Sequence, residues 1–305
     1  MADELSLIDE RFTDPVAASE YLESIRWSDG VVCPKCGESE KEPYRLKGKS
    51  LGKRRVWKCR ACRKQFTVMV GTIFESSHVP LNKWLAAFYL LCSSKKGMSA
   101  HQLHRSIGVT YKTAWFMFHR IREAMKEPAF ASKLGGTVEA DEAYIGGKRS
   151  NASRGRGTAD KKAVVSLVER GGKARSFHVA NVSGPTLGSV IRENVDMSAR
   201  LMTDEWKSYK LVGKEMAAHQ TVAHSYGEYV RGDAYTNTVE GFFSILKRGV
   251  DGTYHHISRA HLHRYLAEFD FRYNRREISD SHRTRSALEG AEGKRLTYRQ
   301  TKRSD

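Results

Sequence analysis

No stretch of about 18 consecutive apolar residues occurs in this sequence, so no segment has the length and apolarity of a membrane-spanning helix. The first residues, MADELSLIDERF, are too acidic and too polar for a signal or transit peptide. Both absences argue against a membrane or secreted protein. We therefore expect a cytoplasmic protein with no membrane partner.

Cysteine is scarce as well. Five cysteines occur in 305 residues, and four of them form two close pairs, which is typical of metal binding in a reducing compartment rather than of a disulfide framework. The pairs, CPKC at 33–36 and CRAC at 59–62, are separated by 22 residues. Two such knuckles present four thiolates in a tetrahedron, so we expect a zinc ribbon. Its one structural Zn²⁺ would be held by Cys33, Cys36, Cys59 and Cys62.

Acidic residues are too few to balance the basic ones, because 35 Asp and Glu face 52 Lys and Arg and leave a net charge of +17. This excess is typical of proteins that bind a polyanion, and nucleic acid is the leading candidate. Residues 1–30 are the exception, with eight acidic and two basic residues. From residue 41 to residue 64, eleven residues are basic and one is acidic. We therefore expect the ribbon to contact phosphates, through residues that include Lys53, Arg54 and Arg55.

A helical period begins after residue 80. Ser99 is a suitable N-cap for a short helix that ends at Gly108, and a longer amphipathic helix begins near Thr110. Two helices joined by such a turn match a helix-turn-helix, in which residues at the front of the second helix contact base edges. In this sequence those residues would be Tyr111, Lys112 and Thr113. An ordinary helical hairpin has the same pattern, and the basic charge and the neighbouring ribbon favour DNA binding.

Strand-like segments follow residue 136. TVEADEAYIGG, KAVVSLVERGG and ARSFHVANV are followed by a helix near residues 185–194 and by a mostly apolar strand that ends on Asp204. Hairpin strands, a helix, a parallel strand and further helices predict an α/β domain with a ribonuclease-H-like fold. One of these further helices is NTVEGFFSILKRG, residues 237–249.

Three carboxylates from separated segments could converge in this fold. Asp141 lies on a central strand, Asp204 at the end of the neighbouring strand and Glu240 on the helix that crosses nearby. Carboxylate oxygens are the ligands that Mg²⁺ requires, and two such ions about 3.5–4 Å apart stabilise the attacking and leaving oxygens of an in-line phosphoryl transfer. By strand alternation Glu139 shares the face of Asp141 and is expected as an accessory ligand, whereas Glu142 points to the opposite face.

The blocks VEADEAYIGG, TDEWKSY and YTNTVEGFFSILKRGVDGTYHHIS resemble those of DDE-type insertion-sequence transposases, specifically the group with an ISXO2-like catalytic domain behind a zinc ribbon. The resemblance covers nearly the whole chain after the acidic start. It implies strand cleavage at transposon ends and strand transfer into target DNA with two Mg²⁺ or Mn²⁺ ions. It also implies a prokaryotic, nucleoid-associated protein that forms a homo-oligomer on DNA. By position, Asp141 and Asp204 match the first two acids of the DDE set.

The third position of the set is Asn or Glu in this group, and both Asn237 and Glu240 are present. Glu240 is favoured because an anion holds Mg²⁺ more strongly than an amide, and because the 35 residues between Asp204 and Glu240 match the usual spacing. Lys247 matches the basic residue two helical turns further on, which is placed to hold a DNA phosphate, and Arg248 follows it.

These features predict five segments. They are an acidic helical leader at 1–30, a zinc ribbon at 31–72, a helix-turn-helix DNA-binding domain at 78–132, a ribonuclease-H-like catalytic domain at 135–285 and a basic tail at 286–305. The predicted function is that of a transposase that binds the terminal inverted repeats of its element and catalyses transposition. Two alternatives stay open: a DNA-binding regulator with an idle transposase-like domain, and a metal-dependent nuclease that does not join strands.

Overall fold

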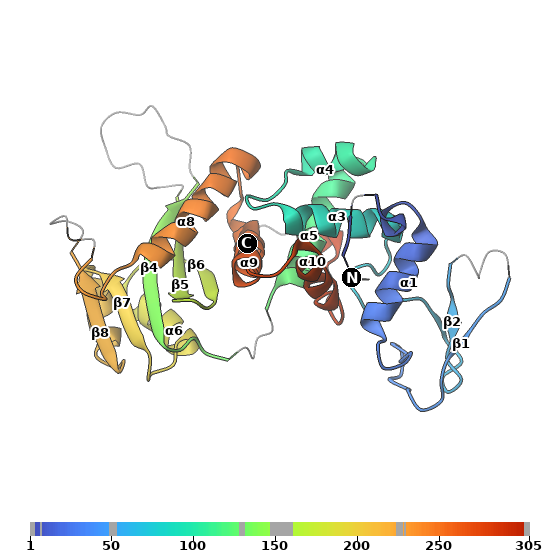
Figure 1. The fold of residues 1–305 in the computed structure, drawn as a ribbon, viewed down its shortest axis with the longest axis horizontal. Coiled ribbons are helices and arrows are strands. Elements are labelled where there is room, and N and C mark those ends of the chain that lie inside the picture. The colour runs from blue at the N-terminus through green and yellow to red at the C-terminus, as the bar shows by residue number, and fades with distance from the viewer. Residues whose placement is uncertain are drawn as a thin grey trace. The chain divides into compact units, whose positions relative to one another are not determined.

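The structure is a computed structural model that describes residues 4–6, 8–48, 54–127, 132–146, 161–223, 228 and 230–301 (Figure 1). The chain divides into two compact units. Unit 1 comprises residues 1–94, 98–126 and 277–305, and unit 2 comprises residues 95–97 and 127–276. Within the described residues no helix is both long enough and apolar enough to cross a membrane.

Unit 1 is mainly helical and carries a small antiparallel sheet with the strand order β1-β2-β3. The strands are β1 (Tyr44–Arg45), β2 (Trp57–Lys58) and β3 (Gln65–Phe66). The helices are α1 (Pro15–Arg26), α3 (Leu81–Ser93), α4 (Ala100–Ile107), α5 (Tyr111–Met125) and α10 (Asp280–Glu289), with the 3-10 turns η1 (Glu10–Phe12) and η5 (Tyr298–Thr301).

Local signals set both ends of α4 and the start of α5. The Ser99 hydroxyl accepts the N–H of Gln102 at 3.1 Å, and Gly108 ends the helix with a φ of 61°, a left-handed conformation that costs glycine little. Thr110 then caps α5 by accepting the N–H of Thr113 at 3.2 Å. The predicted short helix, glycine turn and longer helix are therefore confirmed.

Helix α1 is tied to the ribbon by ion pairs. Oε2 of Glu23, a buried residue of α1, accepts hydrogen bonds from Arg55 Nη2 at 2.5 Å and Arg45 Nη2 at 2.8 Å. Oε1 of the same carboxylate accepts the indole N–H of Trp57 at 3.1 Å, and Glu20 also binds Arg55. The acids of the predicted leader thus neutralise bases of the ribbon, and unit 1 contains both segments.

The described part of the C-terminus belongs to unit 1. Helix α10 packs against α3 and α5, and Leu296 beyond it is buried. Lys294 Nζ donates to the carbonyl oxygens of Ala124 and Lys126 at 3.1 and 2.7 Å. The predicted domains at 135–285 and 286–305 differ from this arrangement, in which unit 2 ends at Arg276. Helical periodicity shows that a segment has an apolar face but not which core that face covers.

Unit 2 is a mixed α/β structure built on a five-stranded sheet. Its strands are β4 (Thr137–Ile145), β5 (Lys162–Glu169), β6 (Ala174–Val179), β7 (Arg200–Asp204) and β8 (Ala218–Val222). Its helices are α6 (Gly184–Asn194), α7 (Lys210–Gly213), α8 (Asn237–Gly249) and α9 (Arg259–Asn274), with a 3-10 turn, η2 (Lys207–Tyr209), and a π-helical turn, η4 (Val250–Tyr254).

The strand order in this sheet is β6-β5-β4-β7-β8. Strands β4, β5 and β6 pair antiparallel in sequence order, whereas β7 runs parallel to β4 and β8 parallel to β7. Helix α6 lies between β6 and β7 in the chain and makes the crossover that a parallel connection needs. The predicted mixed α/β domain, with three hairpin strands, a helix and a parallel strand, is confirmed.

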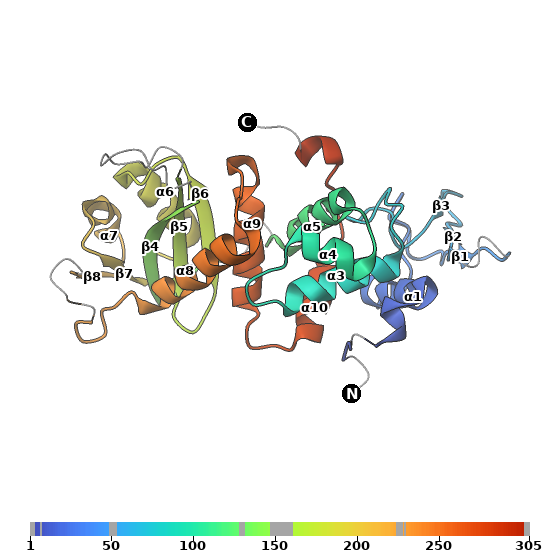
Figure 2. The same ribbon diagram turned by 90° about the horizontal axis from the view of Figure 1, so that it is seen from above.

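Helices cover both faces of the sheet, and Figures 1 and 2 show α6 and α8 on opposite sides of it. On one face, Ile191 of α6 belongs to the same core as Val138 of β4. On the other face, Phe243 of α8 and Leu266 of α9 share a core with Ala143 of β4. Because side chains alternate along a strand, odd-numbered residues of β4 face α8 and even-numbered ones face α6.

Candidate active site and metal centre

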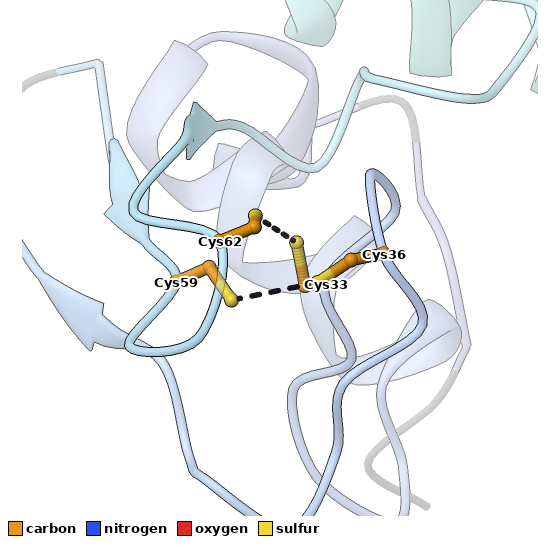
Figure 3. Close-up of side chains that lie close together, drawn as sticks. All are labelled: Cys33, Cys36, Cys59 and Cys62. Atoms are coloured by element: carbon orange, nitrogen blue, oxygen red, sulfur yellow. Dashed lines mark hydrogen bonds between the residues drawn. The ribbon is translucent and has the colours of Figure 1, made fainter.

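The four paired cysteines of unit 1 form one cluster (Figure 3). The sulfur atoms lie within 4.8 Å of one another, with Cys33 3.8 Å from Cys62 and Cys36 3.7 Å from Cys59. Four sulfurs about 2.3 Å from a tetrahedral zinc ion stand about 3.8 Å apart, so the cluster fits a structural Zn²⁺. It is the one such group of three or more possible ligands among the residues that the structure describes. The ribbon strands are only two residues long, so a metal would supply much of the stability of the ribbon.

The two described ribbon residues that were predicted to contact phosphate differ in their exposure to solvent. Arg54 is exposed, as a phosphate contact requires. Arg55 is only 8% exposed, and its guanidinium is bound by Glu23 and Glu20, which differs from the prediction that it contacts DNA. Lys53 lies outside the described residues.

The front of α5 is partly open to solvent. Tyr111 is 45% exposed, and its ring stacks on that of His101 with centroids 4.2 Å apart. Lys112 is exposed, and its Nζ lies 4.9 Å from the ring centroid of Tyr298. Thr113 is half-buried, and its N–H is engaged in the helix cap. Of the three predicted contacts, the first two have the exposure that a nucleic-acid ligand needs.

Asp141 and Asp204 occupy equivalent places on neighbouring strands of unit 2. The parallel ladder of β4 and β7 ends with Glu139 opposite Met202, two residues before each aspartate. Parallel strands are about 4.8 Å apart, so the two aspartates start from adjacent positions on the same face of the sheet. This register puts both aspartates on the face of the sheet that α8 covers, and the charge of Asp204 raises the pKa of Asp141.

Glu240 lies on the first turn of α8, the helix that covers this face of the sheet (Figure 1). Its side chain is exposed, and Oε1 accepts a hydrogen bond from the Thr236 hydroxyl at 2.9 Å. Asn237, the first residue of α8, is exposed as well. Both candidates for the third position therefore stand at the same end of the helix.

A pocket of ≈ 820 Å³ in unit 2 contains part of the predicted site. The carboxylates of Asp141 and Glu240 line it, and so do Lys247 and Arg248 from the last turn of α8. Asp204 is not among its lining residues. The pocket thus places two of the predicted acids and both predicted phosphate-binding cations of α8 around one space.

Lys96 and Asp251 also line this pocket and were not predicted. Lys96 comes from the three-residue segment 95–97, and close packing fixes its backbone. A Cβ atom at Gly249 would lie 2.8 Å from the carbonyl oxygen of Lys96, and one at Gly97 would lie 1.8 Å from the hydroxyl oxygen of Tyr254. Glycine at both positions is the sequence signal that could have indicated a close approach of these segments.

The carboxylates of the site influence one another. Burial is the main cause that raises the pKa of Asp141 to about 7. The N–H of Glu142 lowers this pKa, whereas the charges of Glu142, Asp204 and Glu240 raise it. A divalent cation would offset this repulsion, and the oxygen donors suit Mg²⁺ or Mn²⁺ by their chemistry. In the described structure the three carboxylates are not gathered around one point as the four cysteines are.

Two other acids of β4 serve different contacts. Glu142 points to the face opposite that of Asp141, as predicted, and accepts a 2.6 Å hydrogen bond from the Tyr209 hydroxyl. Glu139 is 0% exposed, and protein donors occupy both of its oxygens, among them Arg170 Nε at 2.7 Å and the N–H of Thr238 at 2.8 Å. This corrects the expectation that Glu139 is an accessory metal ligand.

Two segments of the chain match known protein families. Residues 133–274 match the ISXO2-like transposase domain, and residues 14–65 match the transposase zinc-ribbon domain. The zinc-ribbon match includes α1, in agreement with the ion pairs between α1 and the ribbon strands.

Relatives extend this similarity to most of the chain. An uncharacterized protein in transposable element ISH50 of Halobacterium salinarum is 31% identical over 282 residues, which cover 86% of this chain and 91% of that protein. An uncharacterized transposase-like protein of Haemophilus influenzae is 30% identical over 106 residues, which cover 35% of this chain and 85% of that protein.

Solved structures give a much weaker likeness. The Mos1 strand transfer complex has a TM-score of 0.28 at 12% identity, covering 67% of this chain and 73% of that one. The simian T-cell lymphotropic virus intasome with a PP2A regulatory subunit has a TM-score of 0.29 at 14% identity, covering 55% and 63%. Both likenesses are too weak to show a shared fold.

Proposed function

Since this chain belongs to the family of ISXO2-like transposases that carry a zinc ribbon, we propose that it binds the terminal repeats of its insertion sequence and cuts and joins DNA strands there. The observation that carries the proposal is the pocket in which Asp141 and Glu240 face the same space as Lys247 and Arg248. Phosphodiester cleavage needs both kinds of group: oxygen ligands for cations at the reacting phosphate, and positive charges that hold the adjoining backbone.

Asp141, Asp204 and Glu240 would hold two Mg²⁺ or Mn²⁺ ions, which supply Lewis acidity at the attacking and leaving oxygens of a ribonuclease-H-like active site. The chain contributes orientation. The N–H of Trp206 donates to Asp204 Oδ1 at 3.0 Å, and the hydroxyl of Thr236 donates to Glu240 Oε1 at 2.9 Å. These bonds limit the rotation of both carboxylates before substrate binds, which reduces the entropy lost in forming the reactive complex.

Glu240 is proposed as the third ligand, with Asn237 as the alternative one turn earlier. Glu240 lines the pocket and Asn237 does not, and an anion compensates the charge of a divalent cation better than an amide. Lys247 and Arg248, two turns further along α8, would hold a phosphate next to the scissile bond. In this proposal the carboxylate of Glu240 faces the metal ions, and the cations of Lys247 and Arg248 face the DNA backbone.

Unit 1 is proposed to recognise the ends of the element. Arg54 on the ribbon and Tyr111 and Lys112 at the front of α5 are exposed and have the charge or aromatic surface that nucleic acid contacts require. A net charge of +17 supports binding to both the transposon ends and the target DNA. Joining two ends to one target requires a homo-oligomer on DNA.

The test is an assay of strand cleavage and joining on DNA that carries candidate element ends, with Mg²⁺ or Mn²⁺. We expect nicked and joined products from the wild type and none from Asp204→Asn, whereas Glu205→Gln, at the exposed neighbouring carboxylate, keeps activity. A wild type that binds the ends but is as inert as Asp204→Asn would favour a DNA-binding regulator. Cleavage without joined products would favour a nuclease.

A further inference from the structure

We infer that Glu139 and Arg170 form a positioning pair that fixes the start of α8, and with it Glu240, relative to Asp141. The inference rests on the proposed function, because it assumes that Glu240 and Asp141 hold the same metal ions. Glu139 and Asp141 are two residues apart on β4 and point to the same face of the sheet. One strand would therefore carry a metal ligand and also the anchor of the helix that carries another ligand.

The N–H groups at the start of α8 are capped by this anchor. The side chain of Thr236, at the N-cap position, makes no capping hydrogen bond, and its hydroxyl donates instead to the Glu240 carboxylate. The first N–H groups of a helix have no partner within the helix, and Glu139 supplies one. Its Oε2 accepts the N–H groups of Thr238 at 2.8 Å and Val239 at 3.0 Å, and its Oε1 accepts the Thr238 hydroxyl at 2.9 Å. A negative charge at this position is also favoured by the helix dipole.

Arg170 extends the anchor to the segment that leads into α8. Its Nε donates to Oε1 of Glu139 at 2.7 Å, while its two terminal nitrogens each donate at 2.8 Å to carbonyl oxygens, those of Asp233 and Tyr235. The guanidinium carbon lies 3.4 Å from the centroid of the Tyr235 ring. A single side chain after β5 thus binds the carboxylate of β4 and the backbone before α8.

The carboxylate of Glu139 is saturated by these contacts. Each of its oxygens accepts two hydrogen bonds, and a carboxylate has about four lone-pair sites in all. No acceptor site is left for a metal ion, although Asp141 lies two residues away. Glu139 therefore acts through the helix that it holds. The N–H of Val239 donates a hydrogen bond directly to Glu139, and Glu240 is the next residue along the helix.

The position of Glu240 matters because metal ligation and phosphoryl transfer both depend on small distances. A displacement of about 1 Å in an active site can cost about 10²-fold in rate. Groups that hold the ligands of a metal typically contribute about 10–100-fold to metal affinity or activity. A looser first turn of α8 would therefore weaken metal binding before it unfolded unit 2.

The experiment measures Mn²⁺ binding to the full-length, zinc-loaded protein by electron paramagnetic resonance, together with the Mn²⁺ dependence of end cleavage. Asp204→Asn defines the binding that belongs to the proposed active site. In Glu139→Gln a side-chain NH2 group replaces one carboxylate oxygen. This hydrogen-bond donor then faces the N–H or O–H donors that bind the oxygen in the wild type. We expect the Mn²⁺ dissociation constant of Glu139→Gln and its half-saturating Mn²⁺ concentration to rise about 10-fold or more.

A milder variant keeps the test valid if Glu139→Gln folds poorly. Thr238→Ala removes one hydroxyl contact to Glu139 and leaves the backbone bonds in place, so we expect a rise of about 2–5-fold in the same two quantities. Thr238→Ser keeps a hydroxyl and should restore the wild-type values. Ile191→Ala, which opens a cavity on the α6 face, is the control for stability and should lower the melting temperature without changing Mn²⁺ binding.

Each result has a distinct meaning. Wild-type Mn²⁺ binding in both Glu139→Gln and Thr238→Ala, with loss of binding in Asp204→Asn, would overturn the positioning role and leave the proposed function intact. A loss in Glu139→Gln no larger than that of an equally destabilised Ile191→Ala would overturn it too. Wild-type Mn²⁺ binding in Asp204→Asn would instead contradict the proposed active site itself.

Discussion

The hydroxyl of Tyr209 donates a 2.6 Å hydrogen bond to Glu142 Oε2 and so joins the turn after β7 to strand β4. Tyr209 is fully buried, and burial together with the charge of Glu142 holds the pKa of Tyr209 well above its usual value, so the hydroxyl stays a donor. Tyr209→Phe should lower the free energy of unfolding by about 1–2 kcal/mol, because it removes this donor from a half-buried carboxylate. Urea denaturation checks this, with Tyr144→Phe, on an exposed ring of β4, as the control. Equal stability of Tyr209→Phe and the wild type would contradict it.

The cysteine cluster predicts the effect of losing the metal. Cys36→Ser should reduce bound zinc from one equivalent to none, because three thiolates and a hydroxyl do not match the tetrahedral set. We expect faster hydrogen exchange in peptides around residues 33–66 and no change in peptides of the β4–β8 sheet. The control is Cys92→Ser, which replaces a buried cysteine outside the cluster, and this variant should still bind one equivalent of zinc. One equivalent of zinc in Cys36→Ser would refute the four-ligand assignment.

Arg54 and Arg55 should respond to substitution in opposite ways. Arg54 is exposed, so Arg54→Ala should weaken DNA binding and reduce the slope of log affinity against log salt by about one. Arg55 is bound by Glu23 and Glu20, so Arg55→Ala should leave that slope unchanged and lower the stability of unit 1 by about 2 kcal/mol. Salt titrations of DNA affinity and thermal denaturation of both variants decide the matter. A reduced slope in Arg55→Ala at unchanged stability would show that the ion pairs yield to DNA.

Asp270 predicts a pH dependence of stability. Its carboxylate accepts the backbone N–H of Ser176 at 2.8 Å and the Ser176 hydroxyl at 2.7 Å, yet burial raises its pKa to about 7. In the unfolded chain the pKa of aspartate is about 3.9, so between these values the folded state binds the extra proton. This contribution to stability is present below about pH 4 and is lost as the pH rises through about 7.

Asp270→Asn, which stays neutral, should therefore be more stable than the wild type at pH 8 by on the order of 1–3 kcal/mol. The difference should largely vanish near pH 4, where the wild-type carboxyl is protonated as well. Urea unfolding of both proteins at the two pH values is the measurement. A difference that did not change with pH would mean that Asp270 is ionised in the folded state throughout this range.

Sequence reasoning succeeded where the signal is local. Ser99, Gly108 and Thr110 are residue types that favour helix caps, and they cap α4 and α5 as predicted. The spacing of the two CxxC pairs was enough to predict the cysteine cluster. Strand alternation placed Glu139 on the correct face of β4. It could not show that the helix backbone would occupy both oxygens of Glu139, because that contact joins residues about 100 positions apart.

The same limit explains the other differences. The ion pair of Arg55 with Glu23 spans 32 positions and follows no periodic pattern, so a basic residue in a basic segment was taken for a phosphate contact. Helix α10 has the same period whichever core it covers, so its place in unit 1 was not predicted. Features that depend on neighbouring residues can be predicted from the sequence. Which distant residue a side chain contacts depends on the packing of the folded chain.

Lys96 should contribute to DNA binding at the pocket that holds Asp141 and Glu240. It is exposed there, and its backbone is fixed beside Gly249 at the end of α8, next to the turn that carries Lys247 and Arg248. A third cation at this position would attract a further backbone phosphate of the bound strand. If the proposed function holds, Lys96→Ala should therefore raise the KM for end DNA by about 3–10-fold and reduce the salt slope of binding by about one.

Lys95→Ala is the matched control, because Lys95 is exposed and adjacent in sequence but does not line the pocket. Its KM should stay close to that of the wild type. Mn²⁺ binding should be unchanged in both variants, since neither residue supplies an oxygen ligand. An equal effect of Lys95→Ala and Lys96→Ala would mean that general charge, and not the placement of Lys96 in the pocket, sets the affinity. No effect of either would remove Lys96 from the DNA path, because a phosphate held within reach of an exposed ammonium group must lose affinity when that charge is removed.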